Sequence, residues 1–381
     1  MLLKKCLCCI GLLLSFSFAF AQKKYTTVFA GGNDGYKNFR IPALVSLPNG
    51  DLLAFCEGRV NNAGDFGNID IVMKKSNDHG KTWSALQVVV DVDHLQAGNP
   101  APVVDLADPN YPGGRIFLFY NTGNNHEGEV RKGHGLREVW YVCSTDGGNS
   151  WDKPVNITQQ VHHPNNSRYQ DSLDWRSYAN SPGHALQFKS GTYAGRIYVS
   201  ANHSRGNPQP HFKDYQAHGY YTDDHGKTFH LSENVPYAGG NESMSAVLSD
   251  GKLMMNARNQ QGNERARIIA ISKDGGAHWD TTYIDHQLPD PVCQGSILSS
   301  GTKLLFCNNA STTRRDNLTL YVSRDDGKSY GKKYVIAKSP DAESKGSYSA
   351  YSDIAFINKK TVGILFEIDD YKRIVFAVQK F

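Results

Sequence analysis

An eight-residue pattern returns five times along this chain of 381 residues. Each copy has Ser or Thr first, Asp third, Gly fifth and an aromatic residue eighth. The copies are Ser76–Trp83, Ser144–Trp151, Thr222–Phe229, Ser272–Trp279 and Ser323–Tyr330. The Asp can accept hydrogen bonds from backbone N–H groups of its own turn, Gly allows a positive φ, and the aromatic ring can pack onto a sheet. A turn repeated at intervals of roughly 50 to 80 residues predicts an array of similar β-structured units.

Short segments rich in β-branched and aromatic residues dominate the chain between the copies, for example IPALVSL, RIFLFYN and RIVFAVQ. Most end in turn signals, and no segment shows a long amphipathic helical period. About twenty-four such strands fit a six-bladed β-propeller, with one blade lacking the turn motif. We therefore predict an all-β protein with one propeller domain over residues 22–381.

The first 21 residues are predicted to be a secretory signal peptide. Two lysines precede an apolar run from Leu7 to Phe20, and the small residues Ala19 and Ala21 fit cleavage after Ala21. The run is shorter than a transmembrane helix. We therefore expect a secreted or periplasmic protein with no membrane span.

Charge and spacing patterns exclude several classes of site. The net charge is +4, with acidic and basic residues interspersed, which argues against nucleic-acid binding. The fourteen histidines show no metal-binding spacing, so neither a metal nor another cofactor is expected. The cysteines beyond the signal peptide are expected to be mostly buried thiols, with one disulfide as the alternative. They are Cys56, Cys143, Cys293 and Cys307.

Arg40 lies in the sequence NFRIP, at Asn38–Pro42, directly before the first strong strand. Together with the repeats, this FRIP motif makes the chain resemble the bacterial exo-sialidase, or neuraminidase, family from the first predicted strand to the last. The resemblance implies a monomeric glycoside hydrolase that removes terminal α-linked sialic acids from glycoproteins, glycolipids or oligosaccharides with retention. Two alternatives remain open: a non-catalytic propeller that binds sialic acid or protein, and a trans-sialidase-type variant that transfers the sugar or forms an intramolecular product.

Three arginines hold the carboxylate of sialic acid in this family, and the resemblance assigns them to Arg40, Arg258 and Arg315. A planar guanidinium binds a carboxylate bidentately and keeps its charge. Arg315 begins an Arg-x-Asn element similar to that of the family, but its neighbour Arg314 is an alternative. Glu367 resembles the family glutamate that orients the first arginine, a support that a preorganised site requires.

The resemblance also implies Tyr351 as the nucleophile, Glu242 as its base and Asp65 as the acid/base residue. A tyrosine avoids the repulsion that a carboxylate nucleophile would meet beside the substrate carboxylate, provided that a base removes its proton. The nearby alternatives are Tyr348 and Asp70. Tyr348 lacks the following Asp-Ile, and Asp70 falls within a predicted strand, where a structural role is expected.

Further substrate contacts are expected from Arg59, Asn99 and Tyr178. Arg59 matches a family arginine near the 4-hydroxyl of the sugar, and Asn99 stands where many relatives carry a polar residue. Tyr178 and Trp175 belong to the segment 161–182, which is polar and rich in aromatic residues. We expect this segment to be a long loop that lines the binding face.

Overall fold

The computed structural model describes residues 25–341 and 346–381, and strands make up most of its regular structure. The predicted signal peptide, residues 1–21, lies outside the described residues. Two short helices, α1 (Glu127–Arg131) and α2 (Thr158–Val161), and the 3₁₀ turn η1 (Pro210–Phe212) are the other elements of this part of the chain. The all-β prediction is confirmed.

Four sheets contain four or five strands each and are antiparallel. The first comprises β10 (Trp175–Asn180), β11 (Leu186–Gln187), β12 (Ile197–Arg205), β13 (Tyr215–Thr222) and β14 (His230–Leu231). The second comprises β15 (Gly240–Val247), β16 (Leu253–Asn259), β17 (Ala266–Ser272) and β18 (Thr281–Pro289). The third comprises β19 (Ser296–Ser300), β20 (Lys303–Asn309), β21 (Leu318–Ser323) and β22 (Lys332–Ala337). The fourth comprises β1 (Thr26–Ala30), β23 (Ser349–Asn358), β24 (Thr361–Ile368) and β25 (Arg373–Lys380).

The fifth sheet has eight strands and precedes the others in the chain, apart from β1. It comprises β2 (Asn38–Ser46), β3 (Leu52–Arg59), β4 (Ile69–Ser76), β5 (Gln87–Val90), β6 (Gln96–Asp105), β7 (Arg115–Gly123), β8 (Arg137–Ser144) and β9 (Val155–Asn156). A single parallel pair, Ile69 with Gln96, joins β4 to β6. Hydrogen bonding in the described residues therefore gives five sheets, four of them separate blades of ordinary size, and not the six separate sheets expected.

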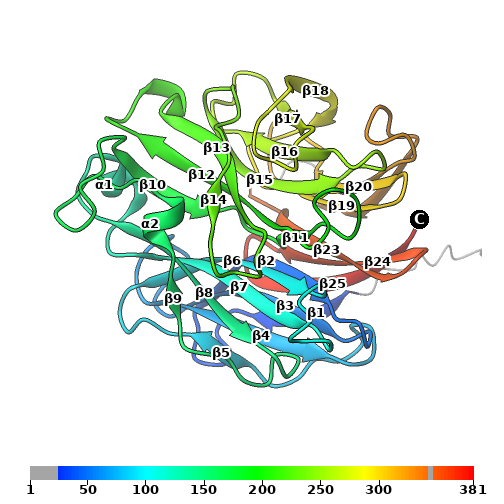
Figure 1. The fold of residues 1–381 in the computed structure, drawn as a ribbon. Coiled ribbons are helices and arrows are strands. Elements are labelled where there is room, and N and C mark those ends of the chain that lie inside the picture. The colour runs from blue at the N-terminus through cyan, green and yellow to red at the C-terminus, as the bar shows by residue number, and fades with distance from the viewer. Residues whose placement is uncertain (1–24, 342–345) are drawn as a thin grey trace, which may run out of the picture.

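The sheets follow one another in chain order around a ring (Figure 1). Contacts run from β2 to β6, from β6 to β10 and β12, from β12 to β15, from β15 to β19, from β19 to β23, and from β23 back to β2. The N-terminal strand β1 pairs with the C-terminal strand β25, so both ends of the described chain belong to one sheet. This arrangement is a β-propeller, in which closure leaves only short sheet edges.

The repeated turns lie between the third and fourth strands of their units and share one hydrogen-bond pattern. In the first copy, the Ser76 hydroxyl donates to Asp78 at 2.8 Å and accepts the Gly80 N–H at 2.8 Å. Asp78 also accepts the Thr82 N–H at 2.9 Å, and Gly80 has a φ of 85°. The same three bonds recur in the other four copies. The turn chemistry expected from the sequence is the chemistry found.

We expect Ser76→Ala to lower the free energy of unfolding by about 1–3 kcal/mol, because the buried Gly80 N–H would lose its acceptor. Urea denaturation followed by tryptophan fluorescence measures this change. Ser167→Ala, at an exposed position, is the control and should stay within about 0.5 kcal/mol of the unmodified protein. Equal stabilities of the two variants would contradict the assignment of Ser76.

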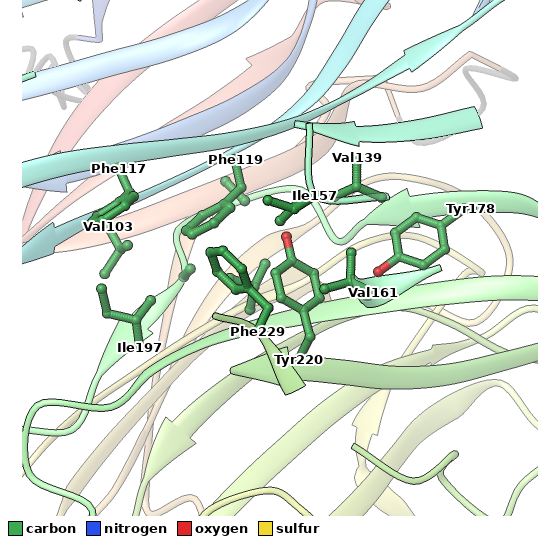
Figure 2. Packing of buried hydrophobic residues seen from close by; sticks show 14 of the residues in the cluster. Val103, Phe117, Phe119, Val139, Ile157, Val161, Tyr178, Ile197, Tyr220 and Phe229 are labelled. Atoms are coloured by element: carbon green, nitrogen blue, oxygen red, sulfur yellow. The ribbon is translucent and has the colours of Figure 1, made fainter. Parts of the chain in front are cut away.

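The aromatic residue that closes each turn packs against its surroundings. Trp83 meets Phe376 of β25 edge-on at a centroid distance of 5.5 Å, and Trp151 meets Phe55 of β3 at 5.9 Å. Phe229 enters the cluster of Figure 2, between rings from β7 and β13. Trp83 and Phe229 therefore join neighbouring sheets, whereas Trp151 joins two parts of the eight-stranded sheet. Such aromatic pairs contribute packing beyond simple area burial.

All four cysteines of the described residues are buried free thiols, which confirms the expectation of thiols and excludes the disulfide. The helices of the described chain are too short and polar for any of them to span a membrane.

Candidate active site

Arg40 is fixed by a carboxylate from the other end of the chain. Its Nε donates to Glu367 Oε1 at 2.7 Å, and the Ile41 N–H donates to the same oxygen at 2.9 Å. Glu367 lies on β24 and is fully buried. Ile41 has a φ of 60°, an unusual value for a β-branched residue, and the β2–β3 register shifts at this point. Glu367 thus stabilises a strained backbone and orients the guanidinium.

A second carboxylate joins the candidate nucleophile to the second arginine. The Tyr351 hydroxyl on β23 donates to Glu242 Oε1 at 2.6 Å. Arg258 Nη1 donates to Glu242 Oε2 at 2.6 Å and to the Tyr351 oxygen at 3.1 Å. Glu242 lies on β15 and Arg258 on the neighbouring β16, so sheet pairing places them beside each other. The structure brings these three residues together as the sequence predicts.

Burial and the nearby Glu242 carboxylate raise the pKa of Tyr351 well above its usual value, although Arg258 and Arg315 oppose this shift. The phenol is therefore protonated in the resting protein and donates its proton towards Glu242. A carboxylate at 2.6 Å is positioned to accept that proton when a reaction demands it. The two arginines lie where they would stabilise the phenolate.

Arg315, and not Arg314, lies with this group. Arg315 Nη1 donates to the Tyr371 hydroxyl at 3.2 Å and Nη2 to the Val292 carbonyl at 3.3 Å, while its guanidinium lies 5.5 Å from the Tyr351 ring. Arg314 donates instead to Asp316 at 2.7 Å. The two adjacent arginines therefore point to different partners, and the geometry favours the sequence assignment of Arg315.

Asp65 lies on the loop between β3 and β4 and is the most exposed of the candidates, with 76 % of its side chain accessible. Its Oδ1 accepts from Arg59 Nη1 at 2.8 Å and lies 4.0 Å from Arg40 Nη1. Partial desolvation by neighbouring atoms favours the protonated form, but Arg59 and Arg40 outweigh it and lower the pKa of Asp65 below its usual value. An exposed carboxylate over an arginine cluster can reach a ligand bound there.

Asn99 is connected to Arg59 through the Glu57 carboxylate. Its N–H donates to Glu57 Oε1 at 2.9 Å, and its side-chain amide donates to the Asn180 carbonyl at 2.9 Å. Glu57 Oε2 in turn accepts from Arg59 Nη2 at 2.6 Å. Asn99 is therefore placed to support Arg59.

Tyr178 is not brought to the arginine cluster. The segment expected to be a long loop contains β10, and Tyr178 on this strand is 2 % exposed within the core of Figure 2. Its ring packs against His162 at a centroid distance of 4.5 Å. Trp175 is also buried, and it stacks on His203. The expectation that Tyr178 and Trp175 line an accessible face is wrong, because their side chains fill the space between sheets, whereas residues 162–174 do form a loop between α2 and β10.

Sequence reasoning missed Tyr371 and Glu57. The Tyr371 ring lies 4.1 Å from the Arg40 guanidinium, and its hydroxyl accepts from Arg315 and donates to Ser347 at 3.0 Å. Tyr371 has a φ of 65°, which no sequence signal revealed. Glu57 could have been found, because residues i and i+2 of a strand share one face and Glu57 stands two positions before Arg59.

Only two carboxylates lie within hydrogen-bond distance of the three guanidinium groups in the described residues. Glu367 pairs with Arg40 and Glu242 with Arg258, whereas Arg315 contacts uncharged oxygens in the described structure. Arg258 Nε is buried without a hydrogen-bond partner. The cluster is therefore suited to bind one anion, and planar guanidinium groups favour a carboxylate.

Comparisons with known proteins find a matching family, related sequences and a similar solved structure. The family model described as BNR repeat-like domain matches residues 50–362. A sialidase from Micromonospora viridifaciens is 31% identical over 360 residues, which cover 88% of this chain and 50% of that protein. An exo-alpha-sialidase from Arthroderma benhamiae is 28% identical, with 89% and 80% covered. The solved structure of the Hadza microbial sialidase Hz136 matches with a TM-score of 0.77 at 24% identity, over 92% of this chain and 67% of that one.

The chain spans only part of the first two curated relatives that it matches. It covers half of the Micromonospora viridifaciens protein and 61% of a sialidase from Bacteroides fragilis, to which it is 27% identical. The likeness to the Hadza structure supports the propeller arrangement of the strands.

Proposed function

The chain belongs to the family of BNR repeat-like domains, and on that premise we propose that it is a retaining exo-α-sialidase. It would remove terminal α-linked sialic acid from glycoproteins, glycolipids or oligosaccharides. One observation carries the proposal: the Tyr351 hydroxyl, bonded to Glu242 at 2.6 Å, lies within a cluster of three guanidinium groups. A tyrosine nucleophile among cations is what a substrate with a carboxylate on its anomeric carbon requires.

Binding would begin with the substrate carboxylate, which Arg40, Arg258 and Arg315 would hold. The bound carboxylate would hold the anomeric carbon beside the Tyr351 oxygen, so part of the binding free energy would be used to orient the substrate for attack. Glu367 keeps Arg40 rigid, so less conformational entropy is lost when the ligand arrives.

In the first chemical step, Glu242 would take the proton of Tyr351 while the phenolic oxygen attacks the anomeric carbon. The glycosidic C–O bond breaks, and protonated Asp65 gives its proton to the departing oxygen. In the second step, Asp65 takes a proton from water, the resulting oxygen attacks the anomeric carbon, and the phenolate leaves and recovers its proton from Glu242. Two displacements retain the configuration.

The purified protein should release the fluorophore from a 4-methylumbelliferyl α-sialoside, and proton NMR should detect α-sialic acid as the first product. If the fluorophore is not released, the proposed enzymatic activity is contradicted. A β product formed first would contradict the tyrosyl intermediate, and a 2,7-anhydro or transferred sugar would favour the trans-sialidase-type alternative.

We expect the pH dependence to reveal the acid role of Asp65. Arg59 and Arg40 lower the pKa of Asp65 in the free protein, but a bound substrate carboxylate would neutralise part of that charge and exclude water. The activity that needs protonated Asp65 is lost as pH rises through its pKa. The basic limb of kcat should therefore lie at least about one pH unit above the basic limb of kcat/KM.

The pH profiles of steady-state kcat and kcat/KM for a sialyl-lactose substrate measure both basic limbs. The control is an aryl sialoside with a strongly acidic leaving group, which needs little protonation and should show a weaker basic limb. Coincident limbs for sialyl-lactose would contradict this role of the arginines.

We also infer that the propeller has six blades. The eight-stranded sheet is held together at β4 and β6 by one parallel pair, and it divides there into two antiparallel units, β2–β5 and β6–β9. Each unit then contributes its first strand to the ring of contacts around the centre.

We further propose that the protein is exported to the periplasm or the outside of the cell and works as a monomer. The lysines and the apolar run within residues 1–21 support export.

A further inference from the structure

An open pocket of about 380 Å³ lies at the base of the loop that carries Asp65. Val60 and Asn68, which stand at the two ends of this loop, both line the pocket. The Val60 N–H donates to the Asn68 carbonyl at 3.1 Å and closes the loop base. The pocket therefore adjoins both ends of the loop.

The pocket is strongly acidic. Asp34, Asp70, Asp91 and Asp93 line it, and no lysine or arginine does. Asp34 pairs with Lys74 at 3.1 Å, but within the described residues the other three have no ion pair with a basic side chain. By contrast, Asp105 and Asp108 elsewhere in the fold both pair with Arg115. The excess negative charge at the pocket is unbalanced.

Two buried oxygen atoms at this pocket have no hydrogen-bond donor. Asp70 is 7 % exposed, and its Oδ2 accepts the Tyr36 hydroxyl at 2.6 Å, but its Oδ1 is buried without a partner. The Oδ1 of Asn68 is buried without a partner as well. Such acceptors are costly unless a donor or a cation meets them.

We propose that this pocket binds a hydrated divalent cation, with Asp70, Asn68 and Asp91 as its protein ligands and Ca²⁺ as the best-suited ion. The His94 imidazole also lines the pocket, but its buried acceptors without partners are the carboxylate oxygen of Asp70 and the amide oxygen of Asn68, ligands of the kind that Ca²⁺ prefers. The pocket is open and larger than one bare ion, so water completes the coordination. Nitrogen- and sulfur-seeking metals are disfavoured because these three ligands offer only oxygen.

The cation would also steady Asp65, a consequence that rests on the proposed function. Asn68 ends the loop and Asp70 is the second residue of β4, so both ligands follow Asp65 closely in the chain. Asp65 is held by Arg59 but remains largely exposed. Fixing the loop base would restrict the positions that the carboxyl group can take, which favours proton transfer.

Tyrosine-sensitised Tb³⁺ luminescence, with Ca²⁺ as competitor, tests the site without reference to activity. Tyr36 beside Asp70 supplies a nearby sensitiser. We expect Ca²⁺ to displace Tb³⁺ with a dissociation constant of about 10⁻⁴–10⁻³ M. Asp91→Asn, at an exposed position that folding tolerates, and Asp70→Asn should weaken binding about tenfold or more. The matched control Asp250→Asn, an exposed residue paired with Lys252, should not.

The proposed site would be overturned if Ca²⁺ did not displace Tb³⁺. It would also be overturned if Asp91→Asn and Asp250→Asn bound Ca²⁺ equally well. Turnover of a sialoside with and without Ca²⁺ tests the effect on the loop: we expect turnover to rise two- to tenfold, on the order of a modest change in positioning. Binding without any change in turnover would overturn the link to Asp65 and leave the site. Binding by a protein that never turns over a sialoside would overturn the proposed function alone.

Discussion

Tyr351→Phe lowers kcat for an α-sialoside by about 10³-fold or more, because the variant has no oxygen with which to attack the anomeric carbon. The ring remains, so the contacts of Arg40 and Arg315 with its face are kept. Glu242 loses one donor but still pairs with Arg258. The thermal midpoint should therefore change little in comparison with activity, and steady-state kinetics with a fluorogenic sialoside measures the loss.

Tyr348→Phe is the matched control for this prediction. Tyr348 lies three residues before Tyr351, and it is half-buried against the cluster around β23 and β24, away from Glu242. Its variant should keep kcat within about twofold, since it loses no group of the proposed site. Full activity of Tyr351→Phe, or an equal loss in both variants, would reject Tyr351 as the nucleophile.

Arg315→Lys should lower kcat/KM by about 10²-fold, mainly through a higher KM, whereas Arg314→Lys should change it by less than about threefold. A lysine keeps the charge of Arg315 but not the planar pair of donors that a carboxylate accepts. A loss of this size corresponds to about 2.7 kcal/mol, within the range for breaking a desolvated charge pair.

Arg315 and Arg314 are adjacent in the chain but have different hydrogen-bond partners. Arg315 reaches Tyr371 and Val292, whereas Arg314 reaches Asp316. Direct binding of a sialic acid analogue, measured by calorimetry, separates weaker binding from slower chemistry. A larger effect of Arg314→Lys would show that the neighbouring arginine holds the carboxylate.

The sequence allowed much of this site to be predicted, because its key residues stand in recognisable local patterns. Short motifs of a few residues contain Arg40, in FRIP, and Tyr351, in Tyr-Ser-Asp-Ile, and the five turns are equally short patterns. The roles of Arg40 and Tyr351, like those of their partners, could be proposed only through a family resemblance. Arg40 and Glu367 are 327 positions apart, and nothing local indicates that their atoms approach to 2.7 Å.

Other features had no local signal at all. Tyr371 reaches the arginines because three successive residues, Asp369 to Tyr371, have positive φ, a backbone path that their side chains do not demand. Tyr178 was misplaced because a polar, aromatic-rich segment was expected to be a loop, although its aromatic side chains are buried on β10. The single bridge from Ile69 to Gln96 merges two units into one sheet, and turn repeats carry no information about such bridges.

The pairing of β1 with β25 has a consequence for how the protein is made. Thr26 pairs with Phe376, so β1 remains an unpaired edge until β25 has been synthesised. Tyr351 and Glu367 lie on the two strands that precede β25. The catalytic group proposed here is therefore assembled only after the other four sheets have been synthesised, and a chain that stalls before β23 would carry the turns and most sheets but no nucleophile.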